Sequence, residues 1–499
     1  MNVEEPSPDH EVTRPVVVTA VVPGGAAVGH VALVVDLDDT LIRGDVAVEA
    51  LIRALRRLSL VFAILRGLLA GPAGIKTLLA RRMPVDASRL CYREEVLALI
   101  AAARGAGRPV ILATAAHWRT ARRVAAAVGP FDAVIASDRR HNLKGTAKLA
   151  AIQAHLGGQA FDYVGDSPAD RPIWRAARTA YTVGVDTGMT GQVRLAEAPG
   201  TLRMLVKAAR PHQWAKNILV LVPLITSGEL TQPAQVARGL IAFVCLSLIA
   251  SSIYLVNDVL DIDADRGHAR KRYRPIARGG LSIPTALVAA IGGVTLGLVA
   301  GALLLGSTSV VALAGYCALT LAYSVRLKAA IIADVLTLAC LYTIRIIVGI
   351  AAIAVPVSFW LLLFSIFLFL SLGYLKRYVE LRGSARAAHE LLSGRGYIPS
   401  DEGIVAMNGV AAGMVSILVL ALFAEAMARG NSYASPALLW LLPLPLLYWL
   451  NRIWMMGRRG EVDSDPVAFA LTDRTSLTVG AILAAILLAA KFIPVLPVV

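Results

Sequence analysis

Two groups of acidic residues, far apart in the chain, have the types and spacing needed for phosphate chemistry. Asp36 and Asp38 are separated by one residue and directly follow the apolar pair Val34-Val35. Because side chains alternate along an extended strand, both carboxylates would leave the end of a buried strand on the same side. Such a pair can divide the roles of nucleophile and general acid/base. Taken alone, it could equally be a solvated acidic turn.

The second group follows a long apolar run and begins at Asn257. On an ideal helix Asp258, Asp261 and Asp265 fall within about 60° of one another, so one face presents three carboxylates. Three like charges on one face repel unless a cation joins them, and oxygen ligands suit Mg²⁺ bound to a polyphosphate. Basic residues come soon after the acids: Lys271, Arg272 and Arg274. Their position favours phosphate as the shared ligand; the alternative is that they only anchor a cytosolic loop.

The elements expected around the first pair form an α/β domain. Between residues 31 and 200, short β-rich runs alternate with helical stretches, which indicates a parallel sheet with crossover helices. The runs are 31–35, 109–114, 133–136, 163–165 and 181–185. Polar residues follow several of these runs: Thr114, Lys144, Lys148, Asp166 and Asp170. The acidic pair therefore does not stand alone.

These pieces, in this order, resemble the haloacid dehalogenase-like hydrolase superfamily over about residues 31–190. The resemblance implies that Asp36 is an aspartyl nucleophile and Asp38 a general acid/base. It also implies that Thr114 donates a hydrogen bond to the phosphate, and that Lys148 or Lys144 neutralises it.

The same resemblance implies a Mg²⁺ site built from carboxylates: Asp36, Asp38, Asp166 and Asp170. The ion would hold carboxylate and phosphate oxygens together. Residues about 45–105 would be a helical cap, the part that selects the substrate in that superfamily. The alternative is a docking module that keeps the motifs and has lost turnover.

Composition assigns the rest of the chain to a membrane. The chain has 499 residues, of which 57% are apolar and 17% charged. The apolar residues are concentrated after residue 216, which excludes a disordered chain or an ordinary soluble enzyme. About nine stretches are candidate membrane spans. They are 217–229, 236–257, 282–305, 308–325, 330–354, 357–375, 403–428, 435–455 and 477–498.

The net charge of +15 follows from topology. The loops after the second, fourth, sixth and eighth spans are basic, and the loops between them are nearly free of basic residues. The positive-inside rule then predicts a cytoplasmic amino-terminal domain and a carboxyl end outside, in a bacterial plasma membrane. We expect no nucleic-acid partner.

A second set of polar residues lies within the membrane half: Tyr323, Lys328, Asp334 and Arg345. Asp334 and Arg345 are eleven residues apart, close to three helical turns, so they share a face about 16 Å apart. Arg345 would lie near the middle of the bilayer, where a guanidinium needs a partner or a wet cavity. A structural ion pair with Glu425 is the alternative.

The pattern N-D-x-x-D-x-x-x-D from Asn257, the later Y-S-x-x-L-K from Tyr323, and about nine helices resemble the UbiA superfamily of intramembrane prenyltransferases. The likeness covers about residues 205–499. Residues 210–217, 271–277 and 376–380 are similar to the branch that transfers phosphoribose from phosphoribosyl pyrophosphate to a polyprenyl phosphate. The resemblance implies that the acids after Asn257 bind Mg²⁺ and pyrophosphate. It adds further candidate substrate contacts: Lys216, Asn217, Lys376 and Arg377.

This sequence departs from the superfamily at one position, because Asp334 has no second acid four residues away. A phosphate-lipid acceptor fits that site better than a prenyl diphosphate. We therefore expect an enzyme that joins phosphoribose to a polyprenyl phosphate such as decaprenyl phosphate, toward an arabinan cell wall. Its soluble domain would remove the 5-phosphate from the lipid-linked product.

Two rival functions remain. One is a transferase that joins a prenyl diphosphate to an aromatic or other small acceptor. The other is a transporter with a regulatory soluble domain, whose charges should lie at broken helices near the bilayer midplane in repeated halves. The acids of this sequence instead cluster at expected cytosolic helix ends, and no obvious repeat is visible, which disfavours a transporter.

The expected organisation is multidomain: a tail over 1–30, a Rossmann-like α/β haloacid dehalogenase domain over 31–190, a linker over 191–209, and an all-α membrane domain over 210–499. A homo-oligomer is compatible with this organisation.

Overall fold

Seven strands form one sheet in the amino-terminal part of the chain, in the order β1-β4-β3-β2-β5-β6-β7. The strands are β1 (Val17–Val18), β2 (Ala32–Val35), β3 (Val110–His117), β4 (Ala133–Ser137), β5 (Phe161–Gly165), β6 (Ala180–Val183) and β7 (Val193–Ala196). All neighbours pair parallel except β1, which runs antiparallel to β4. The five predicted strands are thus confirmed. The expected linker over 191–209 is corrected, because β7 joins the sheet from within it.

This computed structural model describes residues 17–18, 31–55, 60, 71–139, 141–188, 192–196, 200–383, 395–429, 433–462 and 465–494. The expected tail over 1–30, β1 excepted, lies outside the described residues. Contacts divide the chain into two units. Unit 1 is Met1–Ala208 with Val256–Leu287, and unit 2 is Ala209–Leu255 with Val288–Val499.

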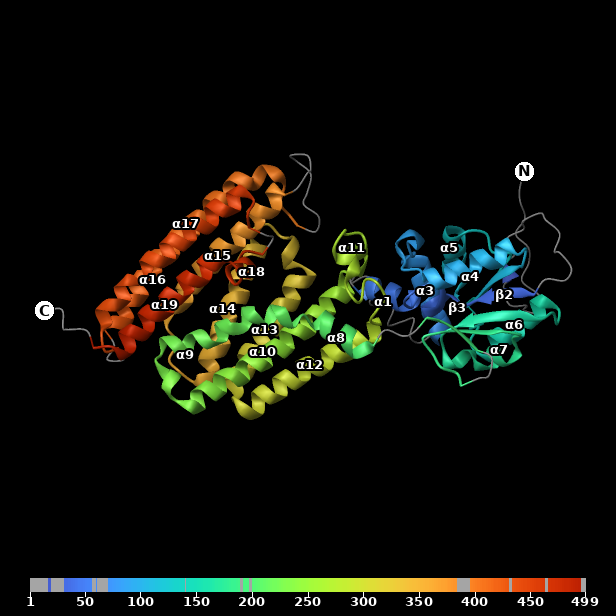
Figure 1. Cartoon of the computed structure of the whole chain (residues 1–499), viewed down its shortest axis with the longest axis horizontal. Coiled ribbons are helices and arrows are strands. Elements are labelled where there is room, and N and C mark those ends of the chain that lie inside the picture. Colours follow the sequence, from blue (N-terminus) through green and yellow to red (C-terminus); the bar gives the residue numbers. More distant parts are fainter. Residues whose placement is uncertain are drawn as a thin grey trace. The chain divides into compact units, whose positions relative to one another are not determined.

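The sheet is buried on both faces, which explains its nearly continuous apolar strands. Side chains alternate: Leu33 and Val35 of β2 enter one core cluster, while Ala32 and Val34 enter the other. Helices α4 (Glu94–Gly105) and α5 (Trp118–Val128) supply the first cluster. Helices α6 (Thr146–Leu156) and α7 (Arg171–Ala176) supply the second, and Figure 1 shows these two pairs on opposite faces.

Two further helices, α1 (Val46–Leu55) and α3 (Gly71–Arg82), lie between β2 and α4 in the chain. Their side chains Ala50, Ala54, Leu79 and Met83 form a separate small core. Helix α4, in contrast, packs on the sheet. The expected cap over 45–105 is therefore shorter, because its last dozen residues belong to the sheet layer.

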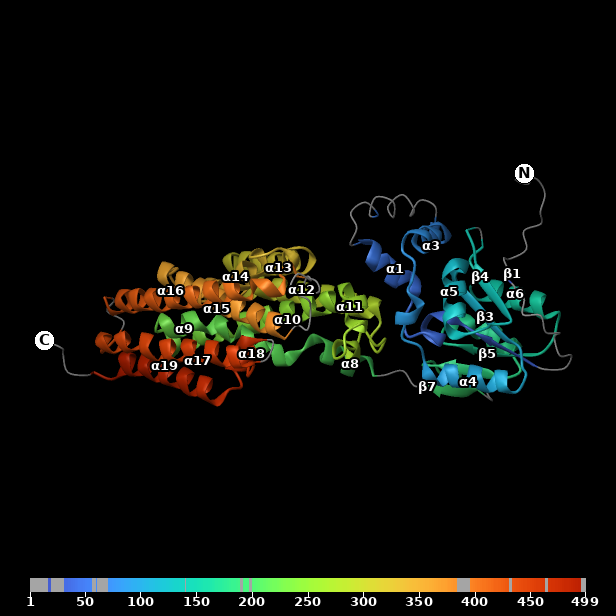
Figure 2. The same ribbon diagram turned by 90° about the horizontal axis from the view of Figure 1, so that it is seen from above.

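The membrane half begins with α8 (Thr201–Ala209), a 3₁₀ segment (Pro211–Leu221) and α9 (Val222–Thr226). The later helices are α10 (Pro233–Leu260), α11 (Ile262–Arg266), α12 (Ile283–Leu304), α13 (Ser307–Val325), α14 (Ala333–Ile353), α15 (Phe359–Arg382), α16 (Glu402–Ala428), α17 (Pro443–Arg459), α18 (Pro466–Ala470) and α19 (Arg474–Phe492). Figure 2 shows the long helices of unit 2 running alongside one another.

In the described residues, eight helices are long and apolar enough to cross a membrane. The expected span over 217–229 is not among them. It consists of part of the 3₁₀ segment and the short α9, and thirteen helical residues would cover about 20 Å of a hydrocarbon core about 30 Å thick. The chain is a multi-pass membrane protein.

Helices α10 and α14 occupy the centre of the membrane half. In each, 61% of the most apolar stretch is buried, against 17% in α12 and α19. Helix α14 also contributes to two core clusters, through residues such as Ile346 in one and Val348 in the other. Polar residues on α14 are therefore enclosed by protein rather than lipid.

Candidate functional site

The carboxyl edge of the sheet brings the predicted hydrolase residues together. Val35 is in register with Val164 and with Leu112. Asp36 and Asp166 therefore directly follow β2 and β5, and Thr114, two residues beyond Leu112 within β3, lies at the same edge. From β2 the chain builds β3 and β4 on one side and β5 to β7 on the other. Such a reversal of strand order opens a crevice at the strands' carboxyl ends, where ligands bind in open α/β sheets.

Lys148 lies at the centre of this edge. Its ammonium donates hydrogen bonds to Asp36 Oδ2 at 2.8 Å, Asp170 Oδ1 at 3.1 Å and the Tyr163 hydroxyl at 3.0 Å. Lys148 is buried, whereas Lys144 is exposed. Between the two lysines that the sequence left open, the geometry favours Lys148 as the group beside Asp36.

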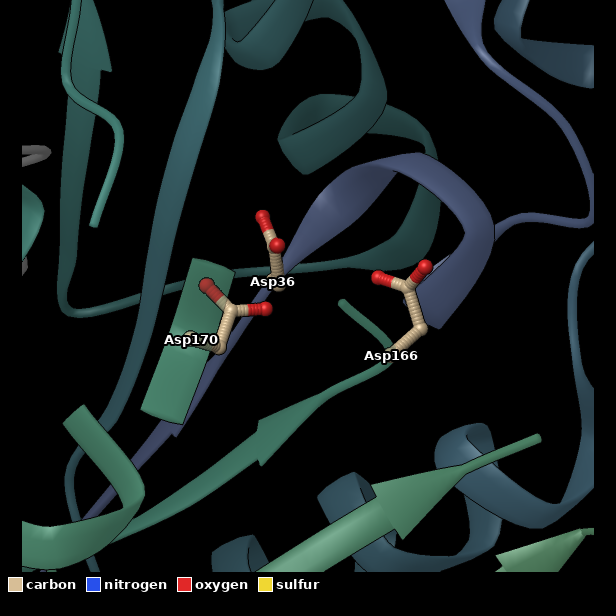
Figure 3. A group of neighbouring side chains, drawn as sticks. All are labelled: Asp36, Asp166 and Asp170. Atoms are coloured by element: carbon tan, nitrogen blue, oxygen red, sulfur yellow. The ribbon is translucent and has the colours of Figure 1, made fainter. Parts of the chain in front are cut away.

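Asp36, Asp166 and Asp170, the acid trio, are the one set of three possible ligands in the described part of the chain with ligand atoms within 4.8 Å of one another. Figure 3 shows the three carboxylates gathered at the strand ends. Asp170 Oδ2 is buried, and no hydrogen bond from a described residue reaches it. A buried carboxylate oxygen without a donor fits a cation ligand, so the trio suits Mg²⁺.

Asp38 is not part of the acid trio. Its Oδ1 accepts a hydrogen bond of 2.9 Å from the backbone N–H of Val46, at the start of α1. Burial, and then the nearby Asp45 carboxylate, raise the pKa of Asp38 well above its ordinary value. A raised pKa favours the protonated form that a general acid needs, which agrees with the role that the sequence resemblance implies for Asp38.

The charges of the acid trio strongly influence one another. Burial, followed by the charge of Asp36, raises the pKa of Asp166 to about 7. Burial alone would lower the pKa of Lys148, but Asp36 and Asp170 outweigh it and raise that pKa. Lys148 therefore stays charged, while Asp166 gains or loses its proton near neutral pH.

Sequence reasoning missed three residues of this site. Thr40 donates a hydrogen bond of 2.9 Å to Asp166 Oδ1, and the Tyr163 hydroxyl contacts Lys148. Gly165 leaves room for the side chains of Tyr163 and Asp170, since a Cβ there would lie 2.7 Å from the Tyr163 ring and 2.8 Å from Asp170 Oδ2. Thr40 could have been identified from the sequence, because it closes the polar run Asp38-Asp39-Thr40 that follows Asp36. Nothing in the sequence marks Tyr163.

The acids after Asn257 form a second site in unit 1, arranged differently from the prediction. Helix α10 ends at Leu260 and α11 starts at Ile262, so Asp261 stands at a break and the three acids do not share one continuous helix. The Arg274 guanidinium lies between the other two, 3.2 Å from Asp258 and 2.7 Å from Asp265. A cation between these carboxylates shows that they can share a positive charge. Lys271 and Arg272 are exposed nearby in the sequence.

The same segment is joined to helix α1 by two ion pairs, of which the first is buried and the second partly exposed. Arg266 of α11 makes a bidentate contact with Glu49 of α1, with its Nη1 2.9 Å from Oε2 and its Nη2 2.7 Å from Oε1. Arg53 of α1 makes another with Asp263, at 2.6 and 2.7 Å. The partners are about 210 residues apart in the chain, so no spacing rule could have found them.

In unit 2, Arg345 of α14 is buried in a polar pocket. It donates to Asn217 Oδ1 at 3.1 Å and to the carbonyl of Leu341, and its guanidinium stands over the rings of Tyr316 and Tyr342. Gly349 permits this arrangement, because a Cβ there would lie 2.0 Å from the Val220 carbonyl. The alternative ion pair with Glu425 is wrong. Glu425 instead contacts Arg429 and Trp440, at 3.1 Å each.

Asp334 does not face Arg345 but Arg377 of α15, with 2.6 Å between its Oδ2 and the arginine Nε. Tyr397 donates to Asp334 Oδ1 at 2.8 Å. Other residues continue this group, which we call the Asp334 cluster: Asp334, Arg377, Glu380, Tyr323, Arg395 and Tyr397. The Lys328 carbonyl accepts from Arg395 at 3.3 Å. Arg395 and Tyr397 were missed as site residues because the sequence around them carries no recognisable motif.

Lys216 of the 3₁₀ segment pairs with Asp465, which sequence reasoning also missed. Asp465 caps α18 by accepting hydrogen bonds from Val467 N and Ala468 N. Burial alone would raise the pKa of Asp465, but the charges of Lys216 and Lys376 lower it below its ordinary value. Of the predicted substrate lysines, Lys216 therefore contacts this carboxylate directly, and Lys376 acts on it through its charge.

Two family models match the chain. Residues 219–474 match the UbiA prenyltransferase family, and residues 33–175 match haloacid dehalogenase-like hydrolases. An uncharacterised protein of Sinorhizobium fredii, y4nM, is 36% identical over 91% of this chain and 89% of its own length. Nodulation protein NoeC of Azorhizobium caulinodans is 35% identical over 54% of this chain and 88% of its own length.

An enzyme of known activity also matches part of the chain. Decaprenyl-phosphate phosphoribosyltransferase of Mycobacterium tuberculosis is 42% identical over 36% of this chain and 61% of its own length. Among solved structures, a UbiA homolog from Archaeoglobus fulgidus bound to DMAPP and Mg²⁺ covers 58% of this chain and 99% of its own. Its identity is 16% and its TM-score 0.46. The chain belongs to the UbiA prenyltransferase family, and a haloacid dehalogenase-like hydrolase domain precedes its membrane domain.

Proposed function

We propose that this enzyme transfers 5-phosphoribose from phosphoribosyl pyrophosphate to a polyprenyl phosphate, with Mg²⁺ at the acids after Asn257. The partial similarity to decaprenyl-phosphate phosphoribosyltransferase supports this substrate pair. When phosphoribose is transferred to the lipid phosphate, pyrophosphate leaves the donor. A divalent ion held by carboxylates, together with basic side chains, would stabilise the negative charge of this leaving group.

The observation that carries the proposal is the charge balance of the Asp334 cluster. Its two carboxylates, Asp334 and Glu380, are both paired with Arg377, and Arg395 lies in the same group through Tyr323. A divalent cation would find no excess negative charge there. Guanidinium groups recognise phosphate directly, so this cluster suits the phosphate of a lipid acceptor better than a metal-bound prenyl diphosphate.

The hydrolase domain would act on the product of the transfer. The acid trio and Lys148 suit a phosphomonoester, and Mg²⁺ there would bind phosphate oxygens beside Asp36. Asp36 would attack the 5-phosphate of the lipid-linked phosphoribose and take over the phosphoryl group, while Asp38, whose pKa is raised, would protonate the departing C5 oxygen. Water would then cleave the aspartyl phosphate and release inorganic phosphate. The y4nM relative, aligned over 91% of this chain, supports a joint role of the two parts.

The orientation completes the proposal. Both phosphorylated substrates carry their charges at the cytosolic side, and the basic loops after alternate spans favour that side for the hydrolase domain. The enzyme would then work in a bacterial plasma membrane, with its carboxyl end outside.

The test is a two-substrate assay on the purified full-length protein. Labelled phosphoribosyl pyrophosphate and polyprenyl phosphate with Mg²⁺ should give a labelled lipid, and labelled phosphate should then be released. The absence of a labelled lipid, while prenyl diphosphate and an aromatic acceptor react, would refute the phosphoribosyl assignment.

Two variants separate the proposed steps. Asp258→Ala should stop formation of the labelled lipid, whereas Asp36→Ala should leave lipid formation intact and stop phosphate release. Asp186→Ala is the matched control, because it removes an exposed carboxylate from the hydrolase domain. Phosphate release that survives Asp36→Ala would exclude the hydrolase domain from the second step.

A further inference from the structure

Helices α1 and α3, which we call the helical insertion, carry a cation, Lys76, to which the proposed chemistry assigns no role. It lies in the middle of α3 and is half-buried. Its ammonium donates hydrogen bonds to the Ala115 carbonyl at 2.8 Å and to Asn142 Oδ1 at 3.1 Å. Both acceptors belong to the sheet layer, so the side chain reaches from the insertion to the hydrolase edge.

These contacts fix where the charge lies. Ala115 directly follows Thr114 at the end of β3, and Asn142 lies in the loop that leads to Lys148. Helices α1 and α3 are held together by their own core, so α3 carries Lys76 on a folded element rather than on a free loop. The ammonium therefore lies beside the carboxyl edge of the sheet, where the acid trio is. Its helix, α3, belongs to the helical insertion and not to the sheet layer.

Lys76 is also not neutralised by a partner. Both of its acceptors are uncharged oxygens, and no carboxylate of the described residues forms an ion pair with it within 4.0 Å. An ammonium has three donors, and two are used. By contrast, the charge of Lys148 is balanced by Asp36 and Asp170. Lys76 thus keeps one donor without a partner among the described residues, and the carboxylates of Asp38 and Asp45 act on its charge only from beyond ion-pair distance. An anionic group of a substrate can therefore contact this ammonium directly.

We infer that Lys76 binds a second anionic group of the hydrolase substrate, so that this site selects a sugar phosphomonoester that also carries a phosphodiester. The inference rests on the proposed function, whose lipid-linked phosphoribose has one phosphate of each kind. Lys148 and the acid trio hold the monoester that is cleaved. Lys76 holds the phosphodiester that is kept, and it acts in specificity rather than in bond breaking.

The experiment compares two soluble substrates on the full-length protein with Mg²⁺. One is ribose 5-phosphate, and the other is the same sugar with a methyl phosphodiester at C1. A charge-assisted hydrogen bond to the diester should be lost in Lys76→Met, so kcat/KM for the diester sugar should fall about ten- to hundredfold. For ribose 5-phosphate the fall should stay below about threefold. Lys76→Arg should keep most of the preference.

Arg82→Met is the matched control, because it removes an exposed cation from the same helix and should change neither substrate. An equal loss for both substrates in Lys76→Met would overturn the inference, because it would identify the lysine as a structural tether. No loss for either substrate would also overturn it.

A different outcome would concern the proposed function instead. If the wild-type protein cleaves neither sugar, the phosphatase role fails, and binding to the Asp36→Asn protein decides the role of Lys76. Tighter binding of the diester sugar that disappears in Asp36→Asn/Lys76→Met supports the inference. Equal binding of the two sugars overturns it.

Discussion

Binding of Mg²⁺ to the acid trio should strengthen about tenfold between pH 6 and pH 8. The reason is Asp166, whose pKa burial and the charge of Asp36 raise to about 7. A carboxyl with this pKa is roughly one-tenth ionised at pH 6 and nine-tenths at pH 8. Mg²⁺ requires the ionised form, so its affinity increases with pH in proportion to that fraction, and binding near pH 6 releases about one proton.

The hydrogen bond from Thr40 to Asp166 Oδ1, 2.9 Å long, provides a way to move this titration. It stabilises the ionised carboxylate and therefore lowers the pKa of Asp166. Thr40→Val removes the donor from a fully buried position with little change in volume. A hydrogen bond worth about 0.5–1.5 kcal/mol corresponds to roughly 0.4–1.1 pH units, so the midpoint should move upward by that amount.

Isothermal titration of the purified protein with Mg²⁺ at pH 6, 7 and 8 measures both quantities, and buffers of different ionisation enthalpy report the proton released. The measurement is made in the Asp258→Ala background, so that ions at the acids after Asn257 do not contribute. Asp166→Asn should remove the pH dependence together with most of the affinity. An affinity that stays constant from pH 6 to pH 8 without proton release would refute the assignment of Asp166 as a titrating ligand.

Three other contacts lead to direct tests. Arg266→Met should lower the unfolding free energy by about 3 kcal/mol in a thermal melt, because Glu49 is only 2% exposed and loses a two-pronged partner; recovery in Glu49→Gln/Arg266→Met would confirm the cause. Arg345→Met should abolish formation of the labelled lipid and leave the elution profile in detergent unchanged, since methionine fills the buried site without a charge. Asp465→Asn should raise the KM for the phosphorylated donor several-fold if Lys216 is held in place by that carboxylate; an unchanged KM would assign Asp465 to capping alone.

The elements that position the hydrolase site could be predicted because each has a local signal. The strand before Asp36 is a short apolar run, and its parallel neighbours follow from the alternation of runs and helices. Spacing also indicated the acids of the acid trio. It could not choose between Lys144 and Lys148, because that choice depends on where α6 begins and which side of its first turn faces the sheet.

The charge partners in the membrane half could not be predicted from spacing. Helical periodicity correctly puts Asp334 and Arg345 on α14, yet each faces a different neighbour: Arg377 of α15 for the first, Asn217 of the 3₁₀ segment for the second. Which segments meet is decided by tertiary packing, and the partners are 43 residues apart in the first pair and 128 in the second. The break at Asp261 has the same origin, since a regular helix pattern does not show where tertiary contacts end it.

The hydrolase site and the Asp334 cluster differ in how their carboxylates are neutralised, although both are proposed to bind a phosphate. In the hydrolase site, Lys148 pairs with two of the three clustered carboxylates, Asp36 and Asp170. A divalent ion would balance the remaining negative charge when a phosphate binds. In the Asp334 cluster both carboxylates are already paired with the guanidinium of Arg377, so the proposed lipid phosphate would bind there without an ion. Asp258 and Asp265 are intermediate between these two sites, because the guanidinium of Arg274 lies where a metal ion would bridge the two carboxylates. Binding of metal–pyrophosphate there requires Arg274 to exchange its carboxylate partners for phosphate oxygens, which a guanidinium can do without losing its charge.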